Sequence, residues 1–234
     1  MALRQRDHWT LILVMAVLLV IFICVAAGKF ASTPETAKLI LNVGEEVQIP
    51  VTRLLQHPLS LSIQFSRVPG SKPIELGEWT SRRGVGYLDF DRPGAPLKVL
   101  VSGLDQEAIF EALPPYGATW RDGTITRQFV VFQEDGNPKR FPWPFNAARP
   151  TLPMGSSIVK VKILEVTADL AGEHVTMVAN APIDSTVSQP NYQYLALVTL
   201  LWPLFAFPLF IYALVLAFIV EKPKTQPEKS SDHL

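Results

Sequence analysis

Cysteine is almost absent from this chain of 234 residues, in which Cys24 is the only one. Cys24 lies inside an apolar run near the N-terminus, so the region that follows has neither a disulfide nor a thiolate ligand for a metal. No asparagine begins an Asn-x-Ser/Thr acceptor, which favours a bacterial envelope over a glycosylating secretory pathway. The region between the apolar runs must therefore be held together by packing alone.

An excess of either charge is also lacking, because 21 lysines and arginines balance 21 acidic residues. This balance argues against nucleic acid as a partner, since phosphate binding normally leaves a basic excess. Sequence patterns typical of zinc proteases, serine hydrolases and phosphate-binding loops are absent. His57 and His174 are predicted to lie at the surface. Asp89 and Asp91 are the best-placed carboxylate pair, but no calcium-binding loop follows them. The sequence therefore predicts no catalytic residue, cofactor or metal.

Charged residues are missing from Leu195 to Val220. At about 1.5 Å per residue this run reaches roughly 39 Å as a helix, more than the ~30 Å hydrocarbon core of a bilayer. We expect a transmembrane helix over 195–220. Pro203 and Pro208 each remove an intrahelical hydrogen bond, which predicts a kink beside Trp202. The freed carbonyls need a partner, so Trp202, Pro203 and Pro208 are candidate interaction residues against the first apolar run or a partner helix.

A first apolar run extends from Trp9 to Ala27. Two readings compete for it. A cleaved signal peptide would end at the small residues before Gly28, whereas a signal anchor over 9–27 would stay in the membrane. The run is longer than the ~7–15 apolar residues of a signal peptide, which favours the anchor.

Basic residues flank the outer ends of both runs: Arg4, Arg6, Lys222, Lys224 and Lys229. By the positive-inside rule, the N-terminus (1–8) and the tail (221–234) are expected in the cytoplasm. The middle region, 28–193, is then periplasmic or extracellular. The tail lacks a hydrophobic pattern and is predicted to be disordered.

The middle region reads as many short strands separated by Gly/Pro turns. The predicted strands are 38–43, 46–51, 59–66, 86–90, 97–102, 124–133, 158–168 and 173–179. Residues 44–45 and 169–172 are expected to close hairpins, and 105–113 to form a helix, with a strand as the alternative. The predicted fold is mainly β: an antiparallel sandwich of about seven or eight strands, with a closed barrel second, flanked by two transmembrane helices.

One proline-rich stretch combines basic and aromatic residues: Lys139, Arg140, Phe141, Trp143 and Phe145. Its prolines keep it extended, so the aromatic rings need a covering surface. Either the rings cap an open end of the β-domain, or they face outward toward headgroups or a partner protein. Lys139 and Arg140 are expected to be exposed in both cases.

These features predict a non-enzymatic protein anchored in the bacterial inner membrane by two helices. We expect a binding, accessory or assembly subunit of an envelope membrane complex. Inhibitors and immunity-type proteins belong to this class of function. Its expected partners are the lipid bilayer and a membrane protein. The alternative is an envelope enzyme or glycan-binding protein whose site has no recognisable motif. Both apolar runs lack charged residues, which argues against a transporter or channel acting alone.

Overall fold

The structure is a computed structural model that describes residues 2–68, 73–84, 87–115, 123–132, 140–142, 149–184, 187–188, 203–204 and 206–215. The chain divides into two compact units, and each is described by itself. The first unit contains Met1–Phe30 and Tyr194–Leu234, and the second contains Ala31–Gln193.

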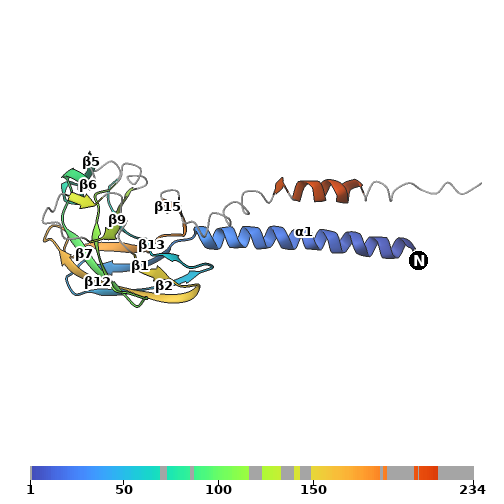
Figure 1. Cartoon of the computed structure of the whole chain (residues 1–234), viewed down its shortest axis with the longest axis horizontal. Helices are drawn as coiled ribbons and strands as arrows, with labels where there is room; N and C mark the ends of the chain where they lie inside the picture. The colour runs from blue at the N-terminus through green and yellow to red at the C-terminus, as the bar shows by residue number, and fades with distance from the viewer. Residues whose placement is uncertain are drawn as a thin grey trace, which may run out of the picture. The chain divides into compact units, whose positions relative to one another are not determined.

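The first unit is built on one long helix, α1 (Ala2–Ser32). Its segment Leu11–Ala31 has 21 residues and is apolar and long enough to cross a membrane. None of the side chains from 11 to 30 is buried, as expected of a helix whose apolar surface is meant for lipid. Figure 1 shows α1 as the long blue helix.

A second membrane-spanning helix over 195–220 is not supported. Among the described residues of that run, the continuous helix is Ala206–Val215. At about 1.5 Å per residue, these ten described residues cover roughly 15 Å. Residues 203–204 are also helical, and 205 lies outside the described residues, so the kink predicted at Pro203 and Pro208 stays a prediction.

The second unit is built on one antiparallel sheet of eight strands in the order β1-β13-β4-β9-β8-β7-β12-β2. The two outer strands of this order, β1 and β2, lie side by side, so the sheet is rolled into a nearly closed barrel (Figure 1). The strands are β1 (Glu35–Ile40), β2 (Glu46–Arg53), β4 (Leu61–Ser66), β7 (Leu97–Ser102), β8 (Ala108–Ala112), β9 (Thr124–Val131), β12 (Gly155–Val166) and β13 (His174–Ala179).

The seam between β1 and β2 is closed without a backbone ladder between these two described strands. At one end, the Thr52 amide donates to the Glu35 carboxylate at 3.4 Å, so a side chain takes the place of a strand carbonyl. At the other end, the connection 41–45 crosses to β12, where Gly44 N donates to Ile163 O and Ile163 N to Glu45 O, both at 2.9 Å. Hydrogen bonds therefore close both ends of the seam between β1 and β2.

Alternating apolar side chains fill the barrel. Leu59, Leu61, Ile63 and Phe65 are all fully buried, as the strict alternation of 59–66 predicted. They belong to one continuous core formed by the barrel strands and their connections. Burying this apolar surface at about 25 cal/mol per Å² is the main stabilising contribution to the fold.

A smaller sheet packs on the outside of β9. It contains three strands in the order β10-β6-β5, namely β10 (Arg140–Pro142), β6 (Tyr87–Arg92) and β5 (Glu78–Gly84). Phe90 of β6 and Phe141 of β10 are buried there with Val130, which lies on β9 next to the inward-facing Phe129. The remaining elements are short: η1 (Ile74–Leu76), β3 (His57–Pro58) paired with β11 (Thr151–Leu152), and β14 (Ile183–Asp184) paired with β15 (Val187–Ser188).

Antiparallel, mainly β architecture is confirmed, but the strand arrangement differs from the sandwich that the sequence placed first. One rolled sheet forms a barrel-like core, and the second layer is confined to the small sheet over β9. Residues 44–45 do not close a β1–β2 hairpin, because β1 pairs with β13 and β2 pairs with β12. Likewise β13 pairs with β1 and β4, not with β12.

The helix expected over 105–113 is wrong, and the strand alternative holds. Residues 108–112 form β8, which pairs with β7 and β9. Phe110 is fully buried while its neighbour Ile109 is 39% exposed, which is the alternation of a strand. Residues 78–84, which lie outside the strands predicted from the sequence, form β5.

Candidate functional site

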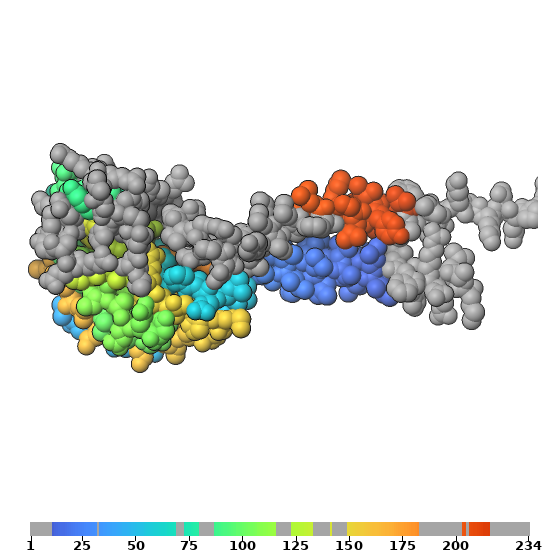
Figure 2. Space-filling model, viewed as in Figure 1, coloured from blue at the N-terminus to red at the C-terminus, as the bar shows by residue number. Residues whose placement is uncertain are grey.

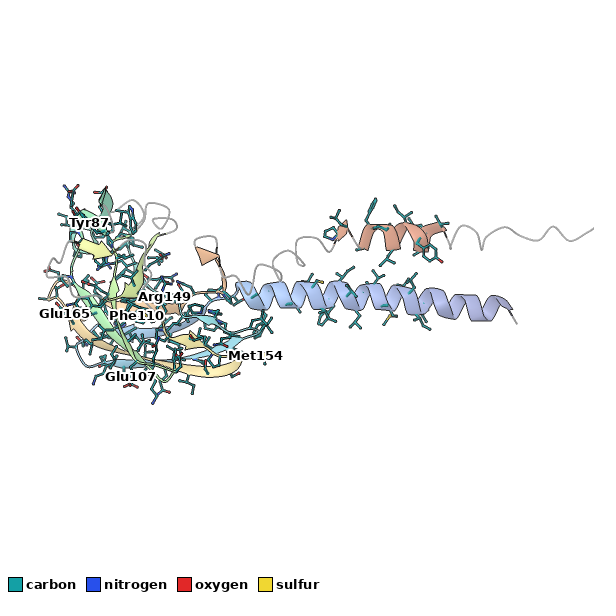
Figure 3. All side chains as sticks on the ribbon, viewed as in Figure 1. Tyr87, Glu107, Phe110, Arg149, Met154 and Glu165 are labelled. Atoms are coloured by element: carbon teal, nitrogen blue, oxygen red, sulfur yellow. The ribbon has the colours of Figure 1, made fainter. Side chains whose placement is uncertain are left out.

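The barrel has two rims, which we name from the chain. The proximal rim is the end where β1 begins at Glu35, beside the last residue of β2, Arg53. The distal rim is the end where β12 finishes at Val166 and β13 begins at His174. Figure 3 shows Met154 and Glu165 at opposite ends of the barrel, near the two ends of β12.

A buried arginine organises the proximal rim. Arg53 is 2% exposed, and its Nη1 donates to both carboxylate oxygens of Glu35 at 2.6 and 2.5 Å. Its Nη2 donates to the Asn180 carbonyl at 3.1 Å, and its Nε donates to His57 Nε2 at 2.9 Å. One guanidinium thus joins the start of β1, the end of β2, β3 and the segment after β13.

His57 is buried, so the predicted surface position is wrong. Its Nε2 accepts the Arg53 hydrogen bond, which places the ring proton on Nδ1, 2.7 Å from the Pro58 carbonyl oxygen. Loss of solvent on burial lowers the pKa of His57, and the Arg53 charge lowers it further, while Pro58 O and Glu35 act in the opposite direction. Both ring nitrogens are engaged in hydrogen bonds that hold the rim, which suits a structural histidine better than a general base.

Asn180 extends this polar cluster into β4. Its Nδ2 donates to Ser60 Oγ at 3.1 Å, and its Oδ1 accepts from Ser62 Oγ at 2.8 Å. Its backbone N–H donates to the Ser60 carbonyl at 2.9 Å. The polar groups of the proximal rim therefore satisfy one another, as buried polar groups must.

Sequence reasoning missed a second buried arginine, Arg127 of β9, which is 1% exposed. Its Nε donates to Leu113 O at 2.9 Å, and its two Nη atoms donate to Ala95 O and Ala112 O at 2.8 Å each. Burial lowers the pKa of Arg127 to about 10, against the opposing effect of Glu111, so the side chain stays charged near neutral pH. The hydrogen bonds of the Arg127 guanidinium hold the β6–β7 connection and the end of β8 against β9.

A signal for Arg127 was present in the sequence. In Thr124–Val131 it occupies the same alternating face as Ile125 and Phe129, both of which are buried. A cation on the apolar face of a predicted strand indicates a buried guanidinium with carbonyl or carboxylate partners.

The other candidate polar residues lie apart from the proximal rim. His174 is exposed at the distal rim, where it lines a surface depression of about 400 Å³ with Lys38 and Ser66. Asp89 and Asp91 lie on β6 in the small sheet. Among the residues that the structure describes, no three histidine, cysteine or acidic side chains gather in a way that could hold a metal ion.

Phe141 is the member of the aromatic stretch that the structure places. It is buried in β10 opposite Leu88, with its ring centroid 5.5 Å from that of Phe90 in an edge-on contact. Phe141 is therefore covered, and its cover is the small sheet that packs on β9. Arg140 lies opposite Asp89 in the same ladder. Lys139, Trp143 and Phe145 lie outside the described residues. Past this stretch, loss of solvent lowers the pKa of the half-buried Arg149.

The prolines of the C-terminal run lie on an apolar groove within the first unit. Pro203 and Pro208 line it from one side and α1 lines it from the other, around a volume of about 900 Å³. The α1 residues are Leu13, Val14, Val17, Leu18 and Ile21. Trp202 lies outside the described residues. The packing role predicted for this segment stays a prediction, now with a defined surface.

Comparison with known proteins adds little. No protein-family model matches the chain, and no curated protein matches it. A crystal structure of a protein from Sulfurospirillum deleyianum aligns with 63% of this chain and 97% of its own, at 14% identity and a TM-score of 0.34. A likeness of that size carries no argument about fold or function.

Proposed function

We propose that this protein is a membrane-anchored binding subunit, acting in an accessory or assembly role within an envelope membrane complex. One observation carries this proposal. The buried charged side chains and the buried histidine of the described barrel hold it together: Arg53 binds His57 and the Asn180 carbonyl at the proximal rim, and Arg127 binds carbonyls. Large apolar side chains fill the barrel interior, so the domain offers its outer surface for function.

Anchoring is assigned to α1, whose apolar segment is long enough to span a bilayer. We further propose that 195–220 crosses the membrane a second time, as its uncharged sequence favours, with Ala206–Val215 as its helical centre. The barrel domain would then lie outside the cytoplasm and both termini inside it, as the flanking basic residues favour.

This topology predicts the behaviour of reporter fusions. A reporter that works only in the cytoplasm should be active when fused at Ala2 and at Leu234, because both ends carry the basic flanks that stay inside. A reporter that needs an oxidising compartment should be inactive at both sites. Activity of the second kind at Leu234 would remove the second crossing, and a mature N-terminus at Gly28 would show that α1 is cleaved.

The groove between α1 and the prolines predicts which change weakens partner recovery. The variant Pro203→Ala with Pro208→Ala removes two rings that line the groove and so reshapes its wall. We expect recovery of a membrane-protein partner in mild detergent to fall about tenfold, equivalent to roughly 1.4 kcal/mol. Partners are identified by mass spectrometry of the tagged full chain.

Ile211→Ala is the matched control for this experiment. Ile211 lies on the same helix and is 45% exposed, but it is not among the residues that line the groove. Recovery with this variant should equal that of the unmodified chain. If the proline variant also retains full recovery, the groove is not the docking surface, and if the unmodified chain recovers no partner at defined stoichiometry, the proposed function is wrong.

A further inference from the structure

Three exposed apolar side chains gather at the proximal rim. Met154 is 73% exposed, and Leu54 and Leu55 are each 38% exposed. In the β2–β12 ladder Arg53 lies opposite Gly155, so Leu54 and Met154 are the next positions beyond that pair. Figure 2 shows the cyan segment near residue 55 beside the yellow segment near residue 155, and Figure 3 places Met154 at this end of the barrel.

The covalent chain holds this apolar edge close to the end of α1. Leu54 directly follows Arg53, whose guanidinium is bonded to Glu35 at 2.5 Å. Only Thr33 and Pro34 separate Glu35 from the last residue of α1. The helix rises about 4.5 Å from Lys29 to Ser32, and the three extended steps from Ser32 to Glu35 add at most about 11 Å. Glu35 is thus tethered within about 15 Å of Lys29, and the Glu35 and Arg53 side chains together add the remaining distance to the edge.

Two acidic side chains of the described residues lie near this edge. Glu35, which is 25% exposed, is paired with Arg53, and the exposed Asp105 accepts a hydrogen bond from Thr151 N at 2.9 Å. The apolar phase nearest to the edge is the bilayer that α1 crosses, and a short tether keeps its effective concentration high. Apolar side chains in this setting bind at the boundary between headgroups and acyl chains.

We propose that Leu54, Leu55 and Met154 lie in the headgroup and acyl boundary of the bilayer, so that the proximal rim of the barrel rests on the membrane. The proposal depends on α1 anchoring the chain, but it requires no protein partner. The occupant of this edge is lipid, and the distal rim is left facing away from the membrane, available to the partner of the proposed function.

Fluorescent labelling of the full chain in phosphatidylcholine vesicles tests this assignment. Cys24→Ser removes the native thiol, and Met154→Cys or Leu54→Cys then introduces one labelling site for an environment-sensitive dye. Val43→Cys is the matched control, since Val43 is 65% exposed in the connection before β2, at the opposite end of that strand from Leu54. At about 3.4 Å per residue, β2 separates the two sites by roughly 25 Å.

We expect lipids brominated near the headgroup end of their acyl chains to quench the dye at 154 and at 54 by about twofold or more, and to leave the dye at 43 unquenched. Thermal unfolding of each labelled variant confirms that the barrel is intact. Equal quenching at 154, 54 and 43 would overturn the proposal. So would a dye at 154 that is blue-shifted but not quenched, because a protein surface would then cover the edge. Failure to find a partner in detergent leaves this result unaffected, so the two proposals fail separately.

Discussion

Replacing Arg127 by methionine is expected to lower the free energy of unfolding by about 3 to 6 kcal/mol. The guanidinium donates to the carbonyls of Leu113, Ala95 and Ala112 at 2.8 to 2.9 Å, inside the protein. Without it, each buried carbonyl loses a hydrogen bond at a cost of about 1 to 3 kcal/mol. Relief from burying a cation offsets part of this cost. Since domains are typically stable by only about 5 to 15 kcal/mol, the variant should be close to unfolding.

Thermal unfolding of the full chain in detergent, followed by circular dichroism, measures this effect. Arg127→Lys should also be strongly destabilised, because a single ammonium cannot reproduce the planar fork that reaches three segments. Arg92→Met is the control, since the Arg92 side chain is 69% exposed and its ion pair with Glu78 has a long separation of 3.7 Å. That change should alter stability by less than about 0.5 kcal/mol. An Arg127→Met variant that unfolds at the same temperature as the unmodified chain would show that the Arg127 hydrogen bonds do not stabilise the fold.

Replacing Arg53 by methionine should cost about 3 to 5 kcal/mol, the range for breaking a buried ion pair by removing one partner. The change leaves the Glu35 carboxylate without its bidentate partner and His57 Nε2 without its donor. The change also removes the contact that closes the proximal end of the β1–β2 seam, where the two described strands have no backbone ladder to hold them together. Unfolding of the full chain is again the measurement.

Arg67→Met provides the comparison for Arg53, because Arg67 makes a similar bidentate pair with Glu173 at 2.7 Å at the distal rim. The two glutamates are about equally exposed, at 25% and 24%, so the difference comes from the arginines. Arg53 is 1% exposed and also binds His57 Nε2 and the Asn180 carbonyl, whereas Arg67 is 20% exposed. We expect a cost of about 1 kcal/mol there. Adding Glu35→Gln to Arg53→Met should recover part of the lost stability, because the stranded charge is removed. Equal losses for Arg53 and Arg67 would mean that burial at the seam adds nothing.

Local patterns in the sequence predicted the elements that depend on neighbouring residues alone. Strict alternation over 59–66 identified the buried face of that strand, and the uncharged run after Trp9 identified the apolar part of α1. Alternation also held an unused signal, since Arg127 stands on the apolar face of β9. This pattern indicates that Arg127 is buried, but it does not identify the carbonyl partners, which come from 14 to 32 residues away in the chain.

Tertiary structure alone decided which strands pair. A Gly-Glu or Ala-Gly turn shows that the chain reverses, but it does not show which strands pair. In this barrel the connection 41–45 joins β1, which pairs with β13, to β2, which pairs with β12, and β1 and β2 form no hairpin. The burial of His57 follows from the same closure, because β1, β2 and the segment after β13 converge on Arg53 only when the sheet rolls up. The sequence by itself determined the apolar anchor, the β class and the alternating core, because these depend on side-chain period and composition. Only the fold decided the pairing order, the seam and the partners of the two buried arginines, because these depend on contacts between residues far apart in the chain.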